Sequence, residues 1–133
     1  MQPYAVVLAD DHVAFREFLR NMLSERKGLK IVGEATDGVE LLNFLKMSKL
    51  MPDLAIVDIA MPNLGGIEAT RRIKVTYPEV KVLILTGKAE KAYVDQAFSA
   101  GASGYLLKED IGPELFSAIE VIRQGKIYTP SFY

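Results

Sequence analysis

The chain has 133 residues, a formal net charge of −1 and no cysteine. Half of its residues are hydrophobic and a quarter are charged, which is typical of a globular domain. The lack of cysteine excludes disulfides and thiolate metal sites. No run of Lys or Arg indicates a nucleic-acid surface, and no apolar run is long enough to cross a membrane. We therefore expect a single cytoplasmic domain without a signal peptide or membrane contact.

Five short apolar runs predict buried strands, because they lack the polar alternation of a strand with one face in solvent. They cover residues 4–9, 29–35, 54–57, 80–85 and 104–107. Lys30 and Glu34 interrupt the second run, which indicates a place nearer the edge of the sheet.

Apolar residues at helical spacing predict five amphipathic helices that alternate with the strands. The first helix carries Phe15, Phe18, Leu19, Met22 and Leu23, which we expect to be core, and it ends at Gly28. The second carries Val39, Leu41, Leu42 and Leu45 and ends before Pro52, the third covers 67–76, and the fourth covers 91–100. The last has Pro113 in its first turn, carries Leu115, Phe116, Ile119 and Ile122, and ends at Gly125.

Strands that alternate with helices predict a doubly wound α/β fold. We expect a flavodoxin-like, five-stranded parallel sheet of order 2-1-3-4-5, with helices on both faces in three layers. The switch point of such a sheet lies between its first and third strands.

Polar residues follow the predicted strands where each strand ends. Asp10 and Asp11 follow the first strand, Asp58 the third, Thr86 ends the fourth, and Lys108 follows the fifth. Because the carboxyl ends of parallel strands share one edge, we expect these side chains to converge there. The alternative is that Asp58 simply caps the following turn and that the acidic pair caps the first helix, as Asp commonly does.

The converging groups favour phosphoryl chemistry. Crowded carboxylates repel one another unless a cation lies among them, and oxygen ligands with open water positions suit Mg²⁺. A carboxylate such as Asp58 can attack a phosphoryl group, while the metal and Lys108 neutralise its oxygens and Thr86 donates a hydrogen bond. We expect His12 to be solvent-exposed rather than a ligand.

The segments ADDH, VDIAMPNLGG, LILTGK and GYLLKED resemble those of response-regulator receiver domains, in particular the LuxR-type (NarL/FixJ) transcription regulators. The resemblance implies that a histidine kinase phosphorylates Asp58. It implies Mg²⁺, with Mn²⁺ as an alternative, bound directly by Asp11 and Asp58, through water by Asp10, and by the carbonyl of Ala60. Thr86 and Tyr105 would be the switch residues and Lys108 the phosphate partner.

Several positions depart from the family pattern. Glu109 follows Lys108 where many receivers have proline, so we do not expect a cis bond there. Gly65 stands where an acid is common, and we assign it no role. Gly87 follows Thr86 where alanine is more usual. Together with small Ala60 and long Lys88, it is expected to change water access to the acyl phosphate and therefore the rate of dephosphorylation.

The resemblance also implies a domain plan. Residues 1–125 would form the receiver, and residues 126–133 would begin a linker to a helix-turn-helix output domain that binds DNA. We expect dimerisation on activation, and no enzymatic turnover beyond self-phosphorylation and slow self-dephosphorylation.

Three other functions share parts of the pattern. A pseudo-receiver would bind partners without taking phosphate, but the acidic pair, Asp58, Thr86 and Lys108 are all present. A haloacid-dehalogenase-type phosphatase would need a D-x-D pair, whereas Ile59 and Ala60 follow Asp58. A flavodoxin would need a hydroxyl- and glycine-rich phosphate loop after the first strand, where the chain has Asp10 and Asp11.

Overall fold

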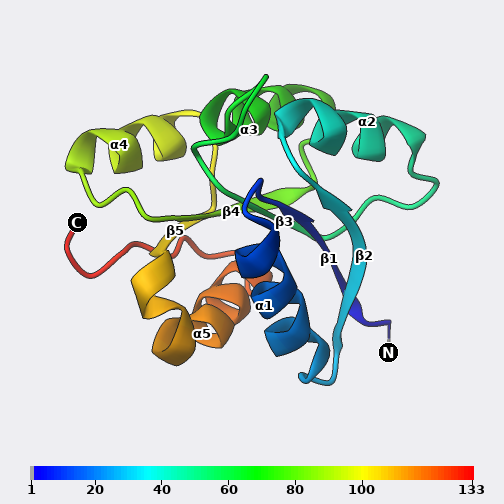
Figure 1. Ribbon diagram of the computed structural model, residues 1–133, viewed down its shortest axis with the longest axis horizontal. Helices are drawn as coiled ribbons and strands as arrows, with labels where there is room; N and C mark the ends of the chain where they lie inside the picture. Colours follow the sequence, from blue (N-terminus) through cyan, green and yellow to red (C-terminus); the bar gives the residue numbers. More distant parts are fainter. Residues whose placement is uncertain (1) are drawn as a thin grey trace.

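The computed structural model describes residues 2–133, in which five parallel strands form one sheet of order β2-β1-β3-β4-β5 (Figure 1). The strands are β1 (Tyr4–Ala9), β2 (Leu29–Ala35), β3 (Leu54–Val57), β4 (Lys81–Thr86) and β5 (Gly104–Leu107). The helices are α1 (Val13–Ser24), α2 (Gly38–Met47), α3 (Gly66–Thr76), α4 (Lys91–Ser99) and α5 (Ile111–Arg123), with a 3-10 turn, η1 (Lys108–Asp110), before α5. The predicted fold class and strand order are confirmed.

Helices cover both faces of the sheet, as Figure 1 shows: α2, α3 and α4 on one face, α1 and α5 on the other. The two cores follow from the pleat, because successive side chains of a strand point to opposite faces. Val7 and Val57 pack under α2 to α4, whereas Leu8 and Ile56 pack under α1 and α5. None of the helices in residues 2–133 has the length and apolar character needed to cross a membrane.

The element bounds differ from the prediction mainly at helix ends and at the start of β4, which begins at Lys81. One core assignment was wrong: Phe18 is 54% exposed. In α1 only Leu19 and Leu23 are buried, and the Phe18 ring lies on the outer flank, 6.4 Å from the ring of Phe15. The sheet covers a narrower sector of α1 than its apolar stripe spans.

The loop from β3 to α3 is held in shape by two interactions. Asp37 caps α2 by accepting a hydrogen bond from the Glu40 amide, and its other oxygen accepts one from the Asn63 side chain at 2.6 Å. At the other end of the loop, the amide of Gly66 donates to the Ile59 carbonyl, and a Cβ on Gly66 would lie 2.0 Å from the carbonyl oxygen of Asp58. The loop therefore returns so closely over Asp58 that only glycine fits at position 66.

Gly66→Ala is expected to destabilise the fold, because the added methyl group meets backbone atoms that cannot rotate away. We expect a loss of about 2–4 kcal/mol in the free energy of unfolding, measured by urea denaturation. The matched control is Gly112→Ala in α5, where nothing lies within 4 Å of the new Cβ. This control is expected to be neutral or to stabilise by up to about 1 kcal/mol. Equal effects of the two substitutions would contradict the steric argument.

Candidate functional site

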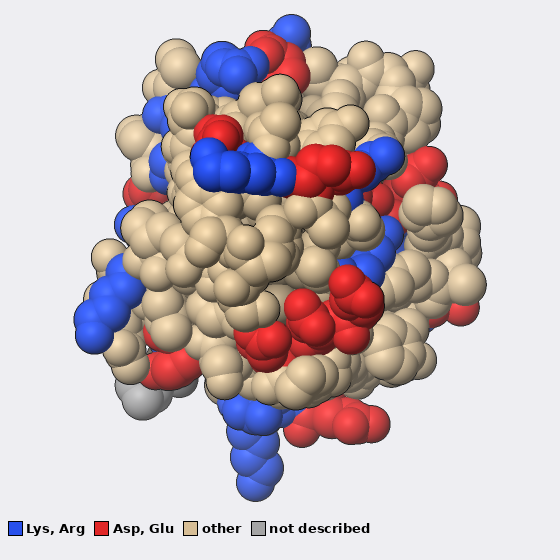
Figure 2. Space-filling view, turned by 90° about the vertical axis from the view of Figure 1, so that its left-hand side faces the viewer, with Lys and Arg blue, Asp and Glu red and all other residues tan. Residues whose placement is uncertain are grey.

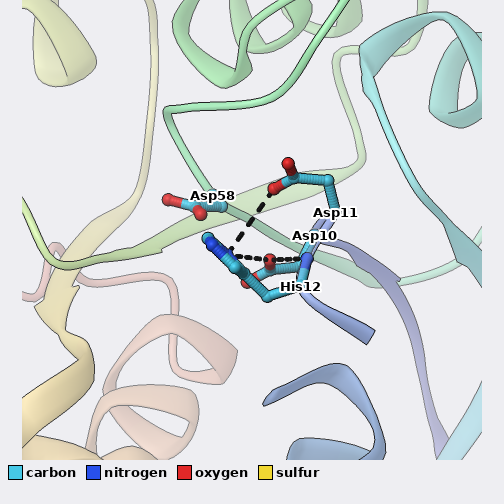
Figure 3. A group of neighbouring side chains, drawn as sticks. All are labelled: Asp10, Asp11, His12 and Asp58. Atoms are coloured by element: carbon cyan, nitrogen blue, oxygen red, sulfur yellow. Dashed lines mark hydrogen bonds and ion pairs between the residues drawn. The ribbon is translucent and has the colours of Figure 1, made fainter. Parts of the chain in front are cut away.

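Two buried carboxylates lie at the carboxyl ends of neighbouring strands. The sheet hydrogen bonding continues one residue beyond β1 and β3, because the Asp58 amide donates to Ala9 and the Asp10 amide donates to Ala35, each at 3.0 Å. Both side chains are thereby fixed at the switch point of the sheet and are less than 5% exposed. Side-chain ligand atoms of Asp10, Asp11, His12 and Asp58 all lie within 4.8 Å of one another (Figure 3).

Lys108 supplies a positive charge to this cluster. Its Nζ lies 2.8 Å from Asp10 Oδ2 and 3.2 Å from Asp58 Oδ2. Burial alone would lower the pKa of Lys108, but the hydrogen bond to Asp10 and the charge of Asp58 outweigh it and raise the pKa above its usual value. Lys108 is therefore an ammonium at neutral pH.

Phe15 supports the same ammonium from α1: its ring centroid lies 4.3 Å from Lys108 Nζ. This is the geometry of a cation–π contact. Arg16, one residue along, donates from Nη1 to the Asp10 carbonyl at 2.6 Å. Neither residue was predicted from the sequence to lie at the site. The feature of the sequence that could have indicated them is their position about one helical turn after Asp11.

The residues present fit a divalent cation. Three carboxylates against one ammonium leave two excess negative charges. Asp58 Oδ1 is buried and has no hydrogen-bond partner within residues 2–133, which is a costly state for a carboxylate oxygen. Mg²⁺ suits such a site, because it takes one or two carboxylates and keeps several waters.

The capping interpretations of the acids do not hold. Residue 12 is the N-cap of α1 and makes no side-chain capping bond, and Gly65 is the N-cap of α3. Asp10 Oδ1 instead accepts a hydrogen bond from the His12 amide at 2.9 Å. The His12 side chain is 66% exposed, as expected, yet its Nδ1 lies 3.2 Å from Asp10 Oδ1 and so borders the cluster.

The remaining predicted residues lie at or just beyond the carboxyl ends of β3 and β4, on the same edge of the sheet as the carboxylates. Thr86 ends β4 in register with Leu107 and is 1% exposed. Ala60 is exposed just beyond Asp58, and a Cβ on Gly87 would meet nothing within 4 Å.

Tyr105 is fully buried, and its hydroxyl donates to the Lys88 carbonyl at 2.6 Å. Burial, followed by the charges of Glu90 and Asp58, raises the pKa of Tyr105, so the hydroxyl remains a donor. This burial matches the view of Tyr105 as core and also the inward position expected of a switch residue. The hydrogen bond ties the middle of β5 to the loop that follows Thr86.

The strand order, the acids after β1 and β3, Thr86 and Lys108 together define a receiver domain, the regulated domain of two-component response regulators. The family model of the response regulator receiver domain matches residues 6–120, and the chain belongs to this family.

Relatives and solved structures agree with this assignment. The transcriptional regulatory protein DegU of Brevibacillus brevis is 38% identical over 123 residues, which are 92% of this chain and 51% of DegU. The response regulator UvrY of Escherichia coli K12 is 36% identical over 126 residues, 95% of this chain and 57% of UvrY. The chain thus spans about half the length of these curated relatives.

Two solved structures have the same fold. A LuxR-family two-component response regulator from Aurantimonas is 36% identical with a TM-score of 0.89, and the match covers 96% of this chain and 89% of that one. The signal receiver domain of the putative regulator NarL from Mycobacterium tuberculosis is 32% identical with a TM-score of 0.87, covering 95% and 100%. The resemblance to LuxR-type regulators is therefore confirmed.

Mg²⁺ is expected to stabilise the folded chain, because the carboxylates converge only there. At ten times the dissociation constant the free energy of unfolding should rise by about 1.4 kcal/mol. Asp11→Asn should lose most of this gain, whereas Glu17→Gln, an exposed acid on α1, should keep it. Urea denaturation with and without MgCl₂ measures both, and equal gains in all three proteins would contradict the assigned site.

Proposed function

We propose that this receiver domain accepts a phosphoryl group on Asp58 and thereby switches the surface formed by α4 and β5. The observation that carries the proposal is the state of Asp58: a buried carboxylate with one oxygen on Lys108 and the other without a hydrogen bond. Such an oxygen has its lone pairs available for attack on phosphorus.

The reaction would be a transfer from a phosphohistidine of a sensor kinase. A carboxylate oxygen of Asp58 forms a bond to phosphorus, the phosphorus–nitrogen bond of the donor breaks, and the leaving imidazole takes up a proton. Mg²⁺, or Mn²⁺ in its place, would supply charge neutralisation at the phosphoryl oxygens. Asp10, Asp11, Asp58 and the carbonyl of Ala60 would hold it.

Three residues would respond to the new dianion. The ammonium of Lys108 is already at the site and would pair with a phosphoryl oxygen, leaving Asp10 to the metal. The hydroxyl of Thr86 would donate to another oxygen and draw the following loop inward. Tyr105 is bonded to that loop at Lys88 and would be held in its buried position.

The larger biological role rests on the relatives. RcsB of Salmonella, 28% identical with a TM-score of 0.88, has been solved as dimers on DNA. We propose that residues 1–125 act as the receiver and residues 126–133 as the start of a linker to a DNA-binding output domain. A histidine kinase would be the upstream partner, homodimerisation would follow phosphorylation, and the protein would act in the cytoplasm.

Intact mass after incubation with acetyl phosphate tests the central step. Wild type should gain one phosphoryl group with Mg²⁺ and none without it. Asp58→Asn should gain none, and the control Glu17→Gln should behave as wild type. A chain that gains no mass under any condition would be a pseudo-receiver. Continuous release of phosphate from phosphate esters would instead indicate a phosphatase.

The lifetime of the acyl phosphate is expected to depend on the residues beside its exposed face. Gly87→Ala fits the fold, since the new Cβ has open space, and Lys88→Ala leaves the carbonyl bonded to Tyr105 in place. We expect each substitution to change the dephosphorylation rate about three-fold, which corresponds to a change in barrier of about 0.7 kcal/mol. Loss of phosphoryl mass over time measures the rate, with Gly112→Ala as control. Unchanged lifetimes would contradict a role for these residues in water access.

A further inference from the structure

The residues after α5 return across the open edge of the sheet (Figure 1). The chain turns at Gly125, whose φ is 83°, and Tyr128 then forms a parallel bridge with Gly104 in β5. The Tyr128 amide donates to the Ser103 carbonyl at 2.9 Å, and the Tyr105 amide donates to the Tyr128 carbonyl at 3.2 Å. Tyr128 therefore satisfies the backbone groups that an edge strand otherwise leaves unpaired.

Side chains fix this segment to β5 and α5. A Cβ on Gly104 would lie 3.3 Å from the Tyr128 Cβ and 2.8 Å from Ile122 Cδ1, so the tyrosine lies over a glycine in close contact. The Tyr128 hydroxyl donates to Glu114, and burial, followed by this hydrogen bond, raises the pKa of Tyr128 to about 12. Pro130 is buried.

The far end of the segment contacts α4. The Tyr133 hydroxyl donates to Asp95, its ring lies 6.0 Å from the Phe98 ring, and Lys91 Nζ lies 5.5 Å from the Tyr133 ring centroid. Residues 127–133 have no charged side chain. Figure 2 views this side of the molecule and shows an uncharged band between charged side chains above and below it.

Tyr105 joins this segment to the switch loop. Its amide is bonded to Tyr128, while its hydroxyl is bonded to Lys88, two residues after Thr86 and three before the start of α4. The helix itself has no side-chain hydrogen bond at its N-cap. One end of α4 is thus positioned through Tyr105, and its body through Tyr133.

We infer that the β5 edge and α4 form a docking surface for residues 126–133, and that docking of this segment is coupled to the buried position of Tyr105. The contacts form a closed ring from Tyr105 through Lys88 and α4 to Tyr133 and Tyr128, and back to Tyr105. We expect that loosening one member of the ring loosens the others, and this coupling must act equally in both directions. The connection to phosphorylation rests on the proposed function: a phosphoryl group on Asp58 would tighten the docked segment.

Hydrogen exchange of the whole chain without phosphodonor tests the coupling. Tyr105→Phe removes the hydrogen bond to Lys88 but keeps the ring. It is expected to speed exchange of the Tyr128 amide about five-fold, the factor that corresponds to one net hydrogen bond. Tyr133→Phe, at the other end of the ring, is expected to speed exchange in residues 88–93 by a similar factor.

The control is Ile31→Val, which removes one methyl group from β2, at the opposite edge of the sheet from β5 and the segment. It should leave both regions at wild-type rates. The coupling would be overturned if Tyr105→Phe left the Tyr128 amide at its wild-type rate. It would also be overturned if Ile31→Val sped the same amides equally, since the effect would then be global unfolding.

A second measurement separates this inference from the proposed function. With Mg²⁺ and acetyl phosphate, exchange of the Tyr128 amide should slow about five-fold in wild type and not in Asp58→Asn. If intact mass shows no phosphoryl group, the proposed function fails while the coupling measured without phosphodonor stands. If the group is present and the exchange rate is unchanged, the connection between Asp58 and the segment is wrong.

Discussion

The ammonium of Lys108 between Asp10 and Asp58 is the interaction on which the functional edge of this sheet depends. Two carboxylates at neighbouring strand ends are almost fully removed from water, and without a cation they would repel each other. Buried ion pairs of this kind contribute little net stability, because desolvation offsets the attraction. Their value here is positional: Lys108 holds the carboxylates of Asp10 and Asp58 close together at the switch point of the sheet.

The charges of this cluster are only partly neutralised. One ammonium leaves two negative charges uncompensated, and Asp58 Oδ1 lacks a partner. A fully neutralised cluster would be more stable but would have no affinity for Mg²⁺ and no free nucleophile. Contacts from the surrounding fold help to offset the free-energy cost of burying these charges. Gly66 lets the following loop close over the Asp58 backbone, and the Phe15 ring faces the ammonium from α1.

Much of this was accessible from the sequence because it follows from periodicity and strand direction. Continuous apolar runs fix which strands are buried, parallel strands share one edge, and the residues after them must then meet. What failed depends on tertiary packing. The stripe of α1 is wider than the sector that the sheet covers, so Phe18 lies outside the core although its spacing is that of a core residue. The place of Phe15 under Lys108 and the docking of Tyr128 on Gly104 join residues far apart in the chain, for which no local pattern exists.

The two edges of the sheet are protected in different ways, and the difference bears on regulation. The β2 strand carries the charged residues Lys30 and Glu34. Charged side chains on an edge strand disfavour pairing with a strand of another molecule. β5 is a four-residue strand without charge, and its protection comes from hydrogen bonds to Tyr128. A covering made of backbone hydrogen bonds and a few aromatic contacts is reversible, whereas a charge on the strand is not. The β5 edge is thus the one whose protection can respond to the position of Tyr105, because the Tyr105 amide is bonded to Tyr128.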